Sequence, residues 1–215
     1  MADGPVSYTL EGSTAVVRMD DGKANALGEA MIEALLAALD RAESEATAIV
    51  LAGRPERFSA GFDLRIMTQG PEAARALLRK GSALLLRLYG TPLPLVIACT
   101  GHALAGGALM VLTGDERIGT QGDYKVGLNE VAIGMPVPVL AMELARDRLL
   151  STELPRATLR ATIYSPDEAV RVGYLDRAEP VGTVIERACE AAHSLGTLSR
   201  TAYAATKDRL RGRTI

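Results

Sequence analysis

The sequence predicts an α/β protein that folds as a single domain. Short apolar runs with the length of buried strands alternate with amphipathic helical segments along the chain. No linker, low-complexity stretch or repeat interrupts this alternation. At 215 residues the chain is long enough for one sizeable core, and its composition, 48% hydrophobic and 23% charged, is ordinary for a globular protein.

The first part of the chain is expected to form a hairpin, a buried strand and two helices. Apolar and polar residues alternate over residues 6–10 and again over 15–19, on either side of a turn, which is typical of a β-hairpin. The spacing of apolar residues predicts a helix over 29–44, and the run Ala48–Ala52 is typical of a buried strand. Pro71 suits the first turn of a second helix that runs to residue 89.

A glycine-rich turn in the middle of the chain is the most informative local feature. Residues 100–107 are mostly small and lie between a predicted strand at 95–98 and a predicted helix at 108–113. The adjacent Gly106 and Gly107 let the backbone approach a ligand, and the first N–H groups of a helix have no partner within it. Such groups suit an atom that carries negative charge. The alternative is a close contact between strand and helix that requires glycine.

The last part of the chain is expected to be mainly helical. Ser165 caps a predicted helix that has Pro166 at its first position and Glu168 three residues after the cap, which together form a capping box. The remaining predicted elements are strands at 116–119, 124–127 and 174–178, and helices at 137–150, 152–161, 184–195 and 201–211.

The overall composition argues against several classes of function. A net charge of −2 gives no electrostatic reason to expect binding to nucleic acid or to a membrane, and 4% aromatic residues without tryptophan argue against a base-stacking surface. The cysteines and histidines are isolated in sequence, so neither a metal site nor a disulfide framework is expected. The first residues resemble neither a signal peptide nor a basic presequence, which predicts a reduced, cytoplasmic protein.

Two loops of similar character are candidates for a catalytic site. Residues 59–63 and 105–107 each follow a predicted strand and each contain glycine. Two backbone N–H groups from separate loops that converge on one carbonyl oxygen make an oxyanion hole. Ser59 in the first loop is not a candidate nucleophile, because no histidine is placed in sequence to activate it.

Glu130 is the candidate base. It lies among Leu128, Val131 and Ile133, and a carboxylate in apolar surroundings has its pKa raised by desolvation, which makes it a better base near neutral pH. The alternative is a solvated glutamate at the end of a strand.

These segments together carry a resemblance to a known family. Residues 58–64 (FSAGFDL), 101–107 (GHALAGG) and 127–136 (GLNEVAIGMP), in this order and spacing, resemble the crotonase (enoyl-CoA hydratase/isomerase) superfamily, and the similarity extends over nearly the whole chain. The resemblance implies a spiral of ββα units with C-terminal helices. It divides the chain into a core at 1–190 and a short C-terminal helical segment at 191–215, and it implies assembly as a homotrimer or hexamer.

The resemblance also implies an acyl-CoA thioester as substrate, with no cofactor. The N–H groups of Phe62 and Gly106 would form the oxyanion hole, and Asp63 and Asp115 would shape turns by accepting backbone N–H bonds. Lys207 resembles a family lysine near the CoA phosphates, the alternative being a solvated helix residue beside Asp208. The other substrate-binding residues implied are Ala26, Ala60, Gly61, Asp63, Leu64, Gly107, Leu109 and Asn129.

One departure from the hydratase pattern favours a particular reaction. Hydratases of this family carry two glutamates, and here the first of the two positions is Leu109, while Glu130 fills the second. Leu109 with Asn129 and Glu130 resembles the mitochondrial-type Δ3,Δ2-enoyl-CoA isomerases, so the resemblance implies an isomerase of fatty-acid metabolism. The alternatives are hydration or another crotonase-type reaction, and an acyl-CoA-binding protein without catalysis.

Overall fold

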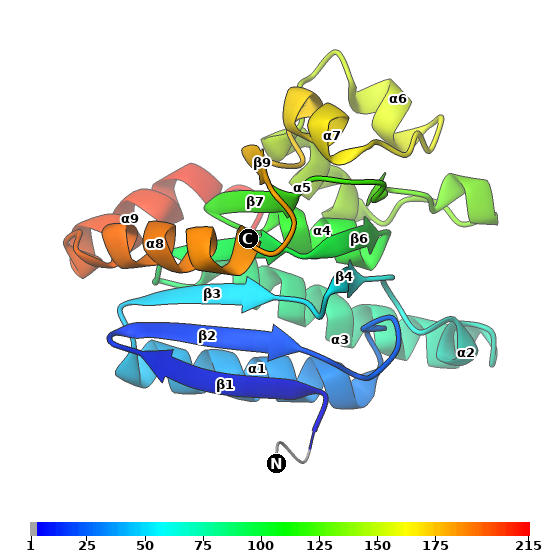
Figure 1. Cartoon of the computed structure of the whole chain (residues 1–215). Helices are drawn as coiled ribbons and strands as arrows, with labels where there is room; N and C mark the ends of the chain where they lie inside the picture. The colour runs from blue at the N-terminus through cyan, green and yellow to red at the C-terminus, as the bar shows by residue number, and fades with distance from the viewer. Residues whose placement is uncertain (1–3) are drawn as a thin grey trace.

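The computed structural model describes residues 4–215 and contains two β-sheets (Figure 1). The larger sheet has the strand order β1-β2-β3-β5-β7-β9, and only its β1–β2 pair is antiparallel. The smaller sheet has the order β4-β6-β8, and both of its pairs are parallel. The strands are β1 (Val6–Glu11), β2 (Thr14–Met19), β3 (Ala48–Ala52), β4 (Glu56–Ser59), β5 (Leu95–Cys99), β6 (Gly101–Leu104), β7 (Glu116–Thr120), β8 (Val126–Gly127) and β9 (Arg177–Glu179).

The helices lie on both faces of the larger sheet. In Figure 1, α1 and α3 lie on one side of β1–β3, and α8 lies on the other side with α9 beside it. The helices are α1 (Glu29–Glu45), α2 (Leu64–Met67), α3 (Pro71–Gly90), α4 (Gly106–Leu112), α5 (Val139–Arg148), α6 (Leu154–Thr158), α7 (Pro166–Val172), α8 (Val184–Gly196), α9 (Arg200–Arg211) and the 3-10 turn η1 (Val131–Ile133).

The chain winds between the two sheets as a spiral. Three times in succession a strand of the larger sheet is followed by a strand of the smaller sheet: β3 by β4, β5 by β6 and β7 by β8. The corner between β5 and β6 requires glycine at position 101, because a Cβ there would lie 2.0 Å from the carbonyl carbon of Glu56. Each turn of the spiral therefore delivers the loop after a short strand to the same edge of the smaller sheet.

Burial on both faces explains why the central strands are continuously apolar. In β3, Ile49 and Leu51 point into the main core under α1, α3 and α4. Val50, between them, points to the second core, where α8 contributes Val184 and Ala188. Side chains alternate across a strand, so a strand covered on both faces must be apolar at every position.

Most of the predicted elements are confirmed, including the hairpin, β3 and the capping box at Ser165. The turn predicted at 100–107 is partly wrong, because Gly101–Leu104 forms β6 and α4 already begins at Gly106. Small residues occur in turns and also in strands that pack closely against a neighbour, so residue size alone does not distinguish the two. The helices predicted at 137–150 and 152–161 are shorter than expected, and β4 and α2 were not predicted. The boundary predicted at residue 190 falls within α8 and stays a prediction.

A buried ion cluster fixes the last helix to the body of the protein. Asp115, at the turn before β7, accepts a bond from the N–H of Leu95 at 2.8 Å, which confirms its expected role in shaping a turn. Its carboxylate also pairs with Lys207 and Arg211 of α9, each at 2.7 Å. Both cations are almost fully buried, so Asp115 is the counterion that makes their burial tolerable.

Replacing Asp115 with alanine should therefore destabilise the fold strongly. The substitution leaves Lys207 and Arg211 buried without their carboxylate, and breaking a buried ion pair on one side costs about 3–5 kcal/mol. Urea unfolding measures the change. Glu190→Ala, which removes an exposed partner of Arg187, is the matched control and should change the free energy of unfolding little. Equal effects of the two substitutions would contradict this account of the cluster.

Candidate active site

Three loops meet at one edge of the smaller sheet and enclose a pocket of about 340 Å³. They follow β4, β6 and β8, whose parallel pairing places their carboxyl ends side by side. From these loops the pocket receives Ala60 and Phe62, then Ala105, then Asn129 and Glu130. The rest of its wall is almost entirely apolar and consists of Leu64, Met67, Leu78, Leu109, Ile133, Met135, Pro136 and Pro138.

Glu130 is the one carboxylate that lines this pocket in the described part of the chain. Its side chain is only 4% exposed, and its Oε2 atom has no hydrogen-bond partner there. Burial raises the pKa of the Glu130 carboxyl above its usual 4.5, and a backbone hydrogen bond opposes this only in part. A buried carboxylate with one oxygen free of hydrogen-bond partners is available to accept a proton from a bound molecule.

Two backbone N–H groups at the pocket have no acceptor among residues 4–215. One belongs to Phe62, in the loop after β4. The other belongs to Gly106, the first residue of α4, which has no carbonyl one turn earlier in the helix to accept its hydrogen bond. The two loops are in close contact, since a Cβ added to Gly61 would lie 2.8 Å from the nitrogen of Gly106. The two donors therefore lie on adjacent segments of the backbone.

The backbone before Gly106 is strained. Ala105, the residue before α4, has φ 47° and ψ −122°, a conformation that residues other than glycine seldom adopt. Strain of this kind costs on the order of 1–3 kcal/mol and persists where the surrounding structure enforces it. Here the N–H of Ala105 donates to Gly127 at 3.0 Å and its carbonyl accepts from Leu109 at 3.0 Å, which fixes the start of α4 at the pocket.

A buried network holds the loop after β4. The hydroxyl of Ser59 donates to the carbonyl of Asn25 at 2.7 Å and accepts from the N–H of Gly61 at 3.2 Å. The Asn25 amide in turn donates to the carbonyls of Met19 and Phe58. Gly107 packs so closely on this loop that a Cβ there would lie 2.1 Å from the Ser59 carbonyl oxygen. Ser59 is thus a structural residue of the loop that carries Phe62.

The structure brings together many of the residues expected at the site. Ala60, Phe62, Leu64, Leu109, Asn129 and Glu130 all line the pocket. Gly61, Gly106 and Gly107 form the adjoining backbone. Ala26 and Asp63 instead line a separate pocket of about 240 Å³. Asp63 accepts from the N–H of Arg65 at 2.9 Å, which confirms its expected role in shaping a turn, and Arg65 lowers its pKa.

The position expected for Lys207 is wrong. It was expected near a CoA phosphate, but its ammonium group donates to the carbonyls of Thr91 and Leu93 and pairs with Asp115. The side chain is only 5% exposed and lines a different cavity from Glu130. The alternative of a solvated helix residue is also wrong. The sequence of a helix does not show whether its lysine is solvated or buried beside a counterion. Here the counterion is Asp115, which lies far from Lys207 in sequence.

Several residues of the site were missed by sequence reasoning. The strained Ala105 and the hub residue Asn25, which has φ 51°, carry no local sign of their conformation beyond the neighbouring glycines and turn residues. Met135 and Pro136 lie in the segment 127–136 that carries the family resemblance, but they were not named as site residues. Pro138 was assigned to the helix predicted at 137–150, whereas it precedes α5 and lines the pocket.

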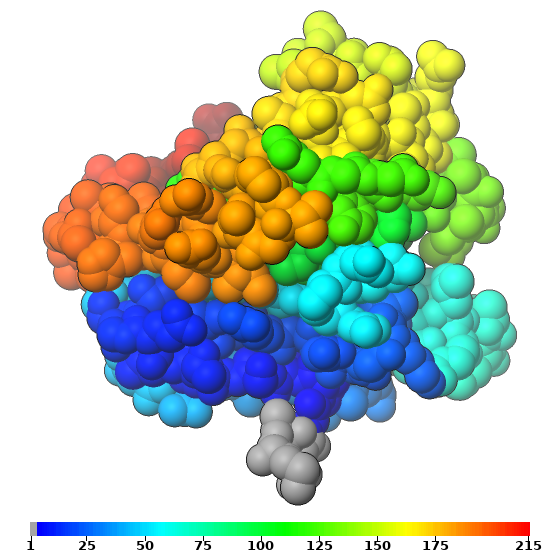
Figure 2. All heavy atoms as spheres, viewed as in Figure 1, coloured from blue at the N-terminus to red at the C-terminus, as the bar shows by residue number. Residues whose placement is uncertain are grey.

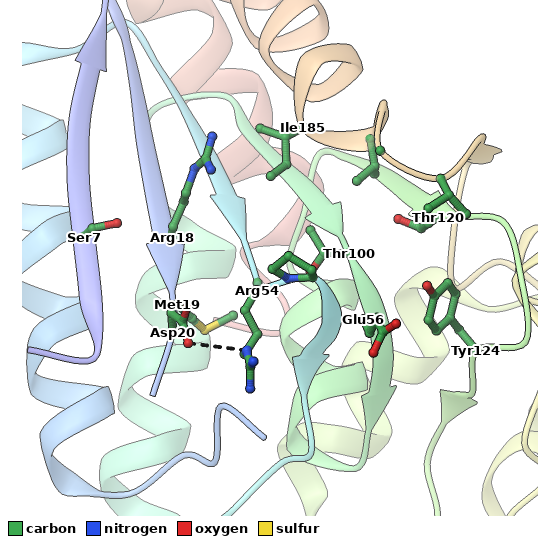
Figure 3. Close-up of a pocket in the computed structure, with 15 residues that line it drawn as sticks. Ser7, Arg18, Met19, Asp20, Arg54, Glu56, Thr100, Thr120, Tyr124 and Ile185 are labelled. Atoms are coloured by element: carbon green, nitrogen blue, oxygen red, sulfur yellow. Dashed lines mark ion pairs between the residues drawn. The ribbon is translucent and has the colours of Figure 1, made fainter. Parts of the chain in front are cut away.

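A further cavity of about 450 Å³ lies at the carboxyl ends of β2 and β3, outside the site built around Glu130. Figure 3 shows its lining, in which Asp20 pairs with Arg54 at 3.4 Å. Arg18 and Glu56 are the other charged side chains of its wall, so its formal charge is balanced. It shares no residue with the pocket at Glu130.

Residues 4–215 show no cluster of three or more His, Cys, Asp or Glu side chains arranged to hold a metal ion. None of the helices in that same range combines the length and apolar character that a membrane span needs.

Comparison with known proteins defines the class. Residues 9–214 match the model of the enoyl-CoA hydratase/isomerase family. Rat mitochondrial enoyl-CoA delta isomerase 1 is 32% identical over 187 residues, which cover 83% of this chain and 63% of the rat protein. A putative enoyl-CoA hydratase of Thermus thermophilus is 32% identical over 93% of this chain and 81% of its own length. A protein of Mycobacterium tuberculosis is described as an enoyl-CoA isomerase in one solved structure and as a probable enoyl-CoA hydratase in another, and both are 43% identical to this chain. The first superposes with a TM-score of 0.94 and covers 100% of this chain and 93% of that one.

The chain therefore belongs to the enoyl-CoA hydratase/isomerase family, and its expected crotonase-type fold is confirmed. It spans less than two thirds of the length of the curated mitochondrial isomerases, 63% for the rat protein and 57% for the human one.

The Glu130 carboxyl should titrate above pH 4.5 in the folded protein, because burial raises its pKa. The protonated form then contributes to stability below the unfolded-state pKa, and this contribution is lost as the pH rises through the folded-state pKa. Carboxyl-carbon NMR against pH measures it directly. Glu168 is the internal control, because hydrogen bonds from Ser165 lower its pKa. A Glu130 midpoint at or below that of Glu168 would contradict the desolvated site.

Proposed function

We propose that this protein is a Δ3,Δ2-enoyl-CoA isomerase that uses Glu130 as its only base. The observation that carries the proposal is the chemistry of the pocket wall in the described residues: one buried carboxylate, with Leu109 where a second would be needed for hydration. Acyl-CoA is the substrate, and the reaction needs no cofactor, because it only moves a proton and a double bond.

The reaction needs a base and an electron sink. The carboxylate of Glu130 removes a proton from C2 of a 3-enoyl thioester, and the electrons move onto the thioester oxygen as a dienolate. The N–H groups of Phe62 and Gly106, which have no other acceptor in the described structure, stabilise that oxygen as its negative charge develops. Glu130 then returns the proton to C4, so the double bond moves from C3 to C2 and the carboxylate is regenerated.

The apolar wall supports isomerisation over hydration. Addition of water to a double bond needs groups that hold the water, remove one proton and deliver another. Leu109 is fully buried and can do none of these. Asn129 is the other polar side chain of the wall, and its buried amide oxygen has no partner in the described residues, but an amide does not accept and return a proton near neutral pH.

Two other functions are the alternatives. Relatives with similar identity include enzymes described as isomerases and as hydratases, so identity alone does not separate the reactions. An acyl-CoA-binding protein without catalysis needs the pocket and the two N–H donors but not a raised pKa at Glu130. The buried, unpartnered carboxylate favours a catalytic role.

Glu130→Gln should lower isomerase activity by about 10³-fold while acyl-CoA still binds, because the amide keeps the shape and cannot act as a base. The conjugated 2-enoyl thioester formed from 3-enoyl-CoA reports the rate by its absorbance, and calorimetry reports the binding. Glu153→Gln, which changes a glutamate outside the pocket, is the control and should retain the activity. Full activity of Glu130→Gln would show that another group is the base.

Gly106→Val should slow the reaction much more than it weakens folding. A Cβ at this position already lies 3.2 Å from Leu27 and from the Phe62 ring, so a branched side chain pushes apart the two segments that carry the donors. The loss of one such donor typically lowers the rate by about 10²–10³-fold. Turnover measured beside a thermal unfolding curve separates the two effects. A folded variant with unchanged turnover would assign this glycine to packing alone.

We also propose that the chain assembles as a homotrimer or hexamer, as the family resemblance implies. Light scattering at micromolar concentration measures the assembly. A monomer under those conditions would contradict this part of the proposal and would leave the chemistry at Glu130 untouched.

A further inference from the structure

A glycine interrupts the buried face of α3, the helix that lies beneath α4 in Figure 1. The buried residue without a side chain is Gly81. The other buried residues of this helix are all large: Leu77, Leu84, Leu85, Leu88 and Tyr89. Glycine is a poor residue for the interior of a helix, so a buried glycine there indicates a neighbour that needs the space.

The neighbour that needs the space is the aromatic ring of Phe62. A Cβ on Gly81 would lie 2.1 Å from Cε1 and 2.5 Å from Cζ of that ring, far inside van der Waals contact. The opposite edge of the ring faces Gly106, where a Cβ would lie 3.2 Å from Cδ2 and Cε2. The ring therefore fills the space between the middle of α3 and the first residue of α4.

The backbone on both sides of Phe62 is held by Leu27. The N–H of Leu27 donates to the carbonyl of Gly61 at 2.8 Å, and the carbonyl of Leu27 accepts from the N–H of Asp63 at 3.2 Å. These two bonds form a parallel bridge between Leu27 and Phe62. Because the residues before and after Phe62 make the bonds of such a bridge, the N–H of Phe62 itself points away from Leu27.

The ring of Phe62 links the two backbone donors beside the pocket at Glu130. Phe62 supplies one N–H, and its ring meets Gly106, which supplies the other. Apart from its two side-chain torsions the ring is rigid, so contact at both edges limits how the two segments can move. Figure 2 shows two segments that flank this pocket, α2 (turquoise) and the segment after β8 (green), at one side of the molecule.

We propose that the Phe62 ring, seated against Gly81, is a spacer that fixes the distance between the N–H groups of Phe62 and Gly106, and that Gly81 is a positioning residue for the reaction. This inference rests on the proposed function, since it requires both N–H groups to bind one thioester oxygen. Donors stabilise a developing negative charge only within about 2.7–3.1 Å of it. A methyl group at position 81 pushes the ring toward Gly106 and moves the donors out of that range.

Gly81→Ala should lower kcat by about 10–100-fold and change KM little, because the donors act mainly on the transition state. Steady-state rates with 3-enoyl-CoA and a thermal unfolding curve measure the two effects. Gly90→Ala is the matched control, because it makes the same change at the last residue of α3, where a Cβ meets only the side chain of Ile215. A folded Gly81→Ala protein with unchanged kcat would assign Gly81 to packing alone and overturn the proposal.

Phe62→Leu tests the other half of the spacer. Leucine is smaller than the ring, so the single variant should lower kcat because the two segments lose their fixed spacing. Combined with Gly81→Ala, leucine leaves room for the added methyl group, so the double variant should be about tenfold faster than Gly81→Ala alone. A double variant whose loss equals the product of the two single losses contradicts the spacer. Should Gly81→Ala not fold, an unchanged kcat in Phe62→Leu overturns it.

Acetoacetyl-CoA separates the spacer from the proposed isomerisation, because its enolate absorbs in the near ultraviolet and reports stabilisation of the thioester oxygen without turnover. The unmodified protein and Gly90→Ala should raise the enolate absorbance, and Gly81→Ala should lose most of the increase. This pattern without turnover of 3-enoyl-CoA would contradict the isomerase proposal and support the spacer. Binding of acetoacetyl-CoA to the unmodified protein without an enolate signal would overturn the spacer together with the oxyanion site.

Discussion

The parallel pairing of β4, β6 and β8 is the constraint on which the site depends. Residues from three distant parts of the chain follow these strands, and only a parallel sheet brings three successive carboxyl ends to one edge. The three strands are short, so the pairing is supported from outside: the larger sheet fixes where each strand begins, and buried bonds from Asn25 and Ser59 fix the loop after β4. Strain at Ala105 is tolerated at this edge because the surrounding bonds leave the backbone no alternative.

The chemical character of the pocket follows from what surrounds one carboxylate. The wall is apolar, so desolvation raises the pKa of Glu130 and no neighbour neutralises it. Two backbone N–H groups without an acceptor in the described residues, those of Phe62 and Gly106, lie beside the same pocket. The proposed isomerisation moves a proton between two carbons and needs one base and donors for one developing oxyanion. A second carboxylate at Leu109 would change the chemistry, because it would hold water in the pocket.

Local patterns predicted much of this structure, and tertiary contacts account for what they missed. The burial of β3 and the capping box at Ser165 each depend on residues that are close together in sequence, and both were predicted. The strand β6 was mistaken for a turn, because its small residues reflect close packing against β4 and β8. The candidate base and both candidate donors were found from glycine placement, apolar context and family resemblance. Lys207 was misplaced, because the carboxylate that buries it comes from residue 115, and no local pattern records such a pairing.

The most direct measurement of the central claim is the change in conjugated-thioester absorbance when the purified protein meets 3-enoyl-CoA and, separately, 2-enoyl-CoA. A single base in a dry pocket moves a double bond but adds no water. The account therefore predicts that absorbance rises with 3-enoyl-CoA and that no hydrated product forms from 2-enoyl-CoA. A fall in absorbance with 2-enoyl-CoA that accompanies formation of a 3-hydroxyacyl product, with no change for 3-enoyl-CoA, would contradict it. So would a flat signal with both substrates, which would leave a protein that binds acyl-CoA and does not transform it.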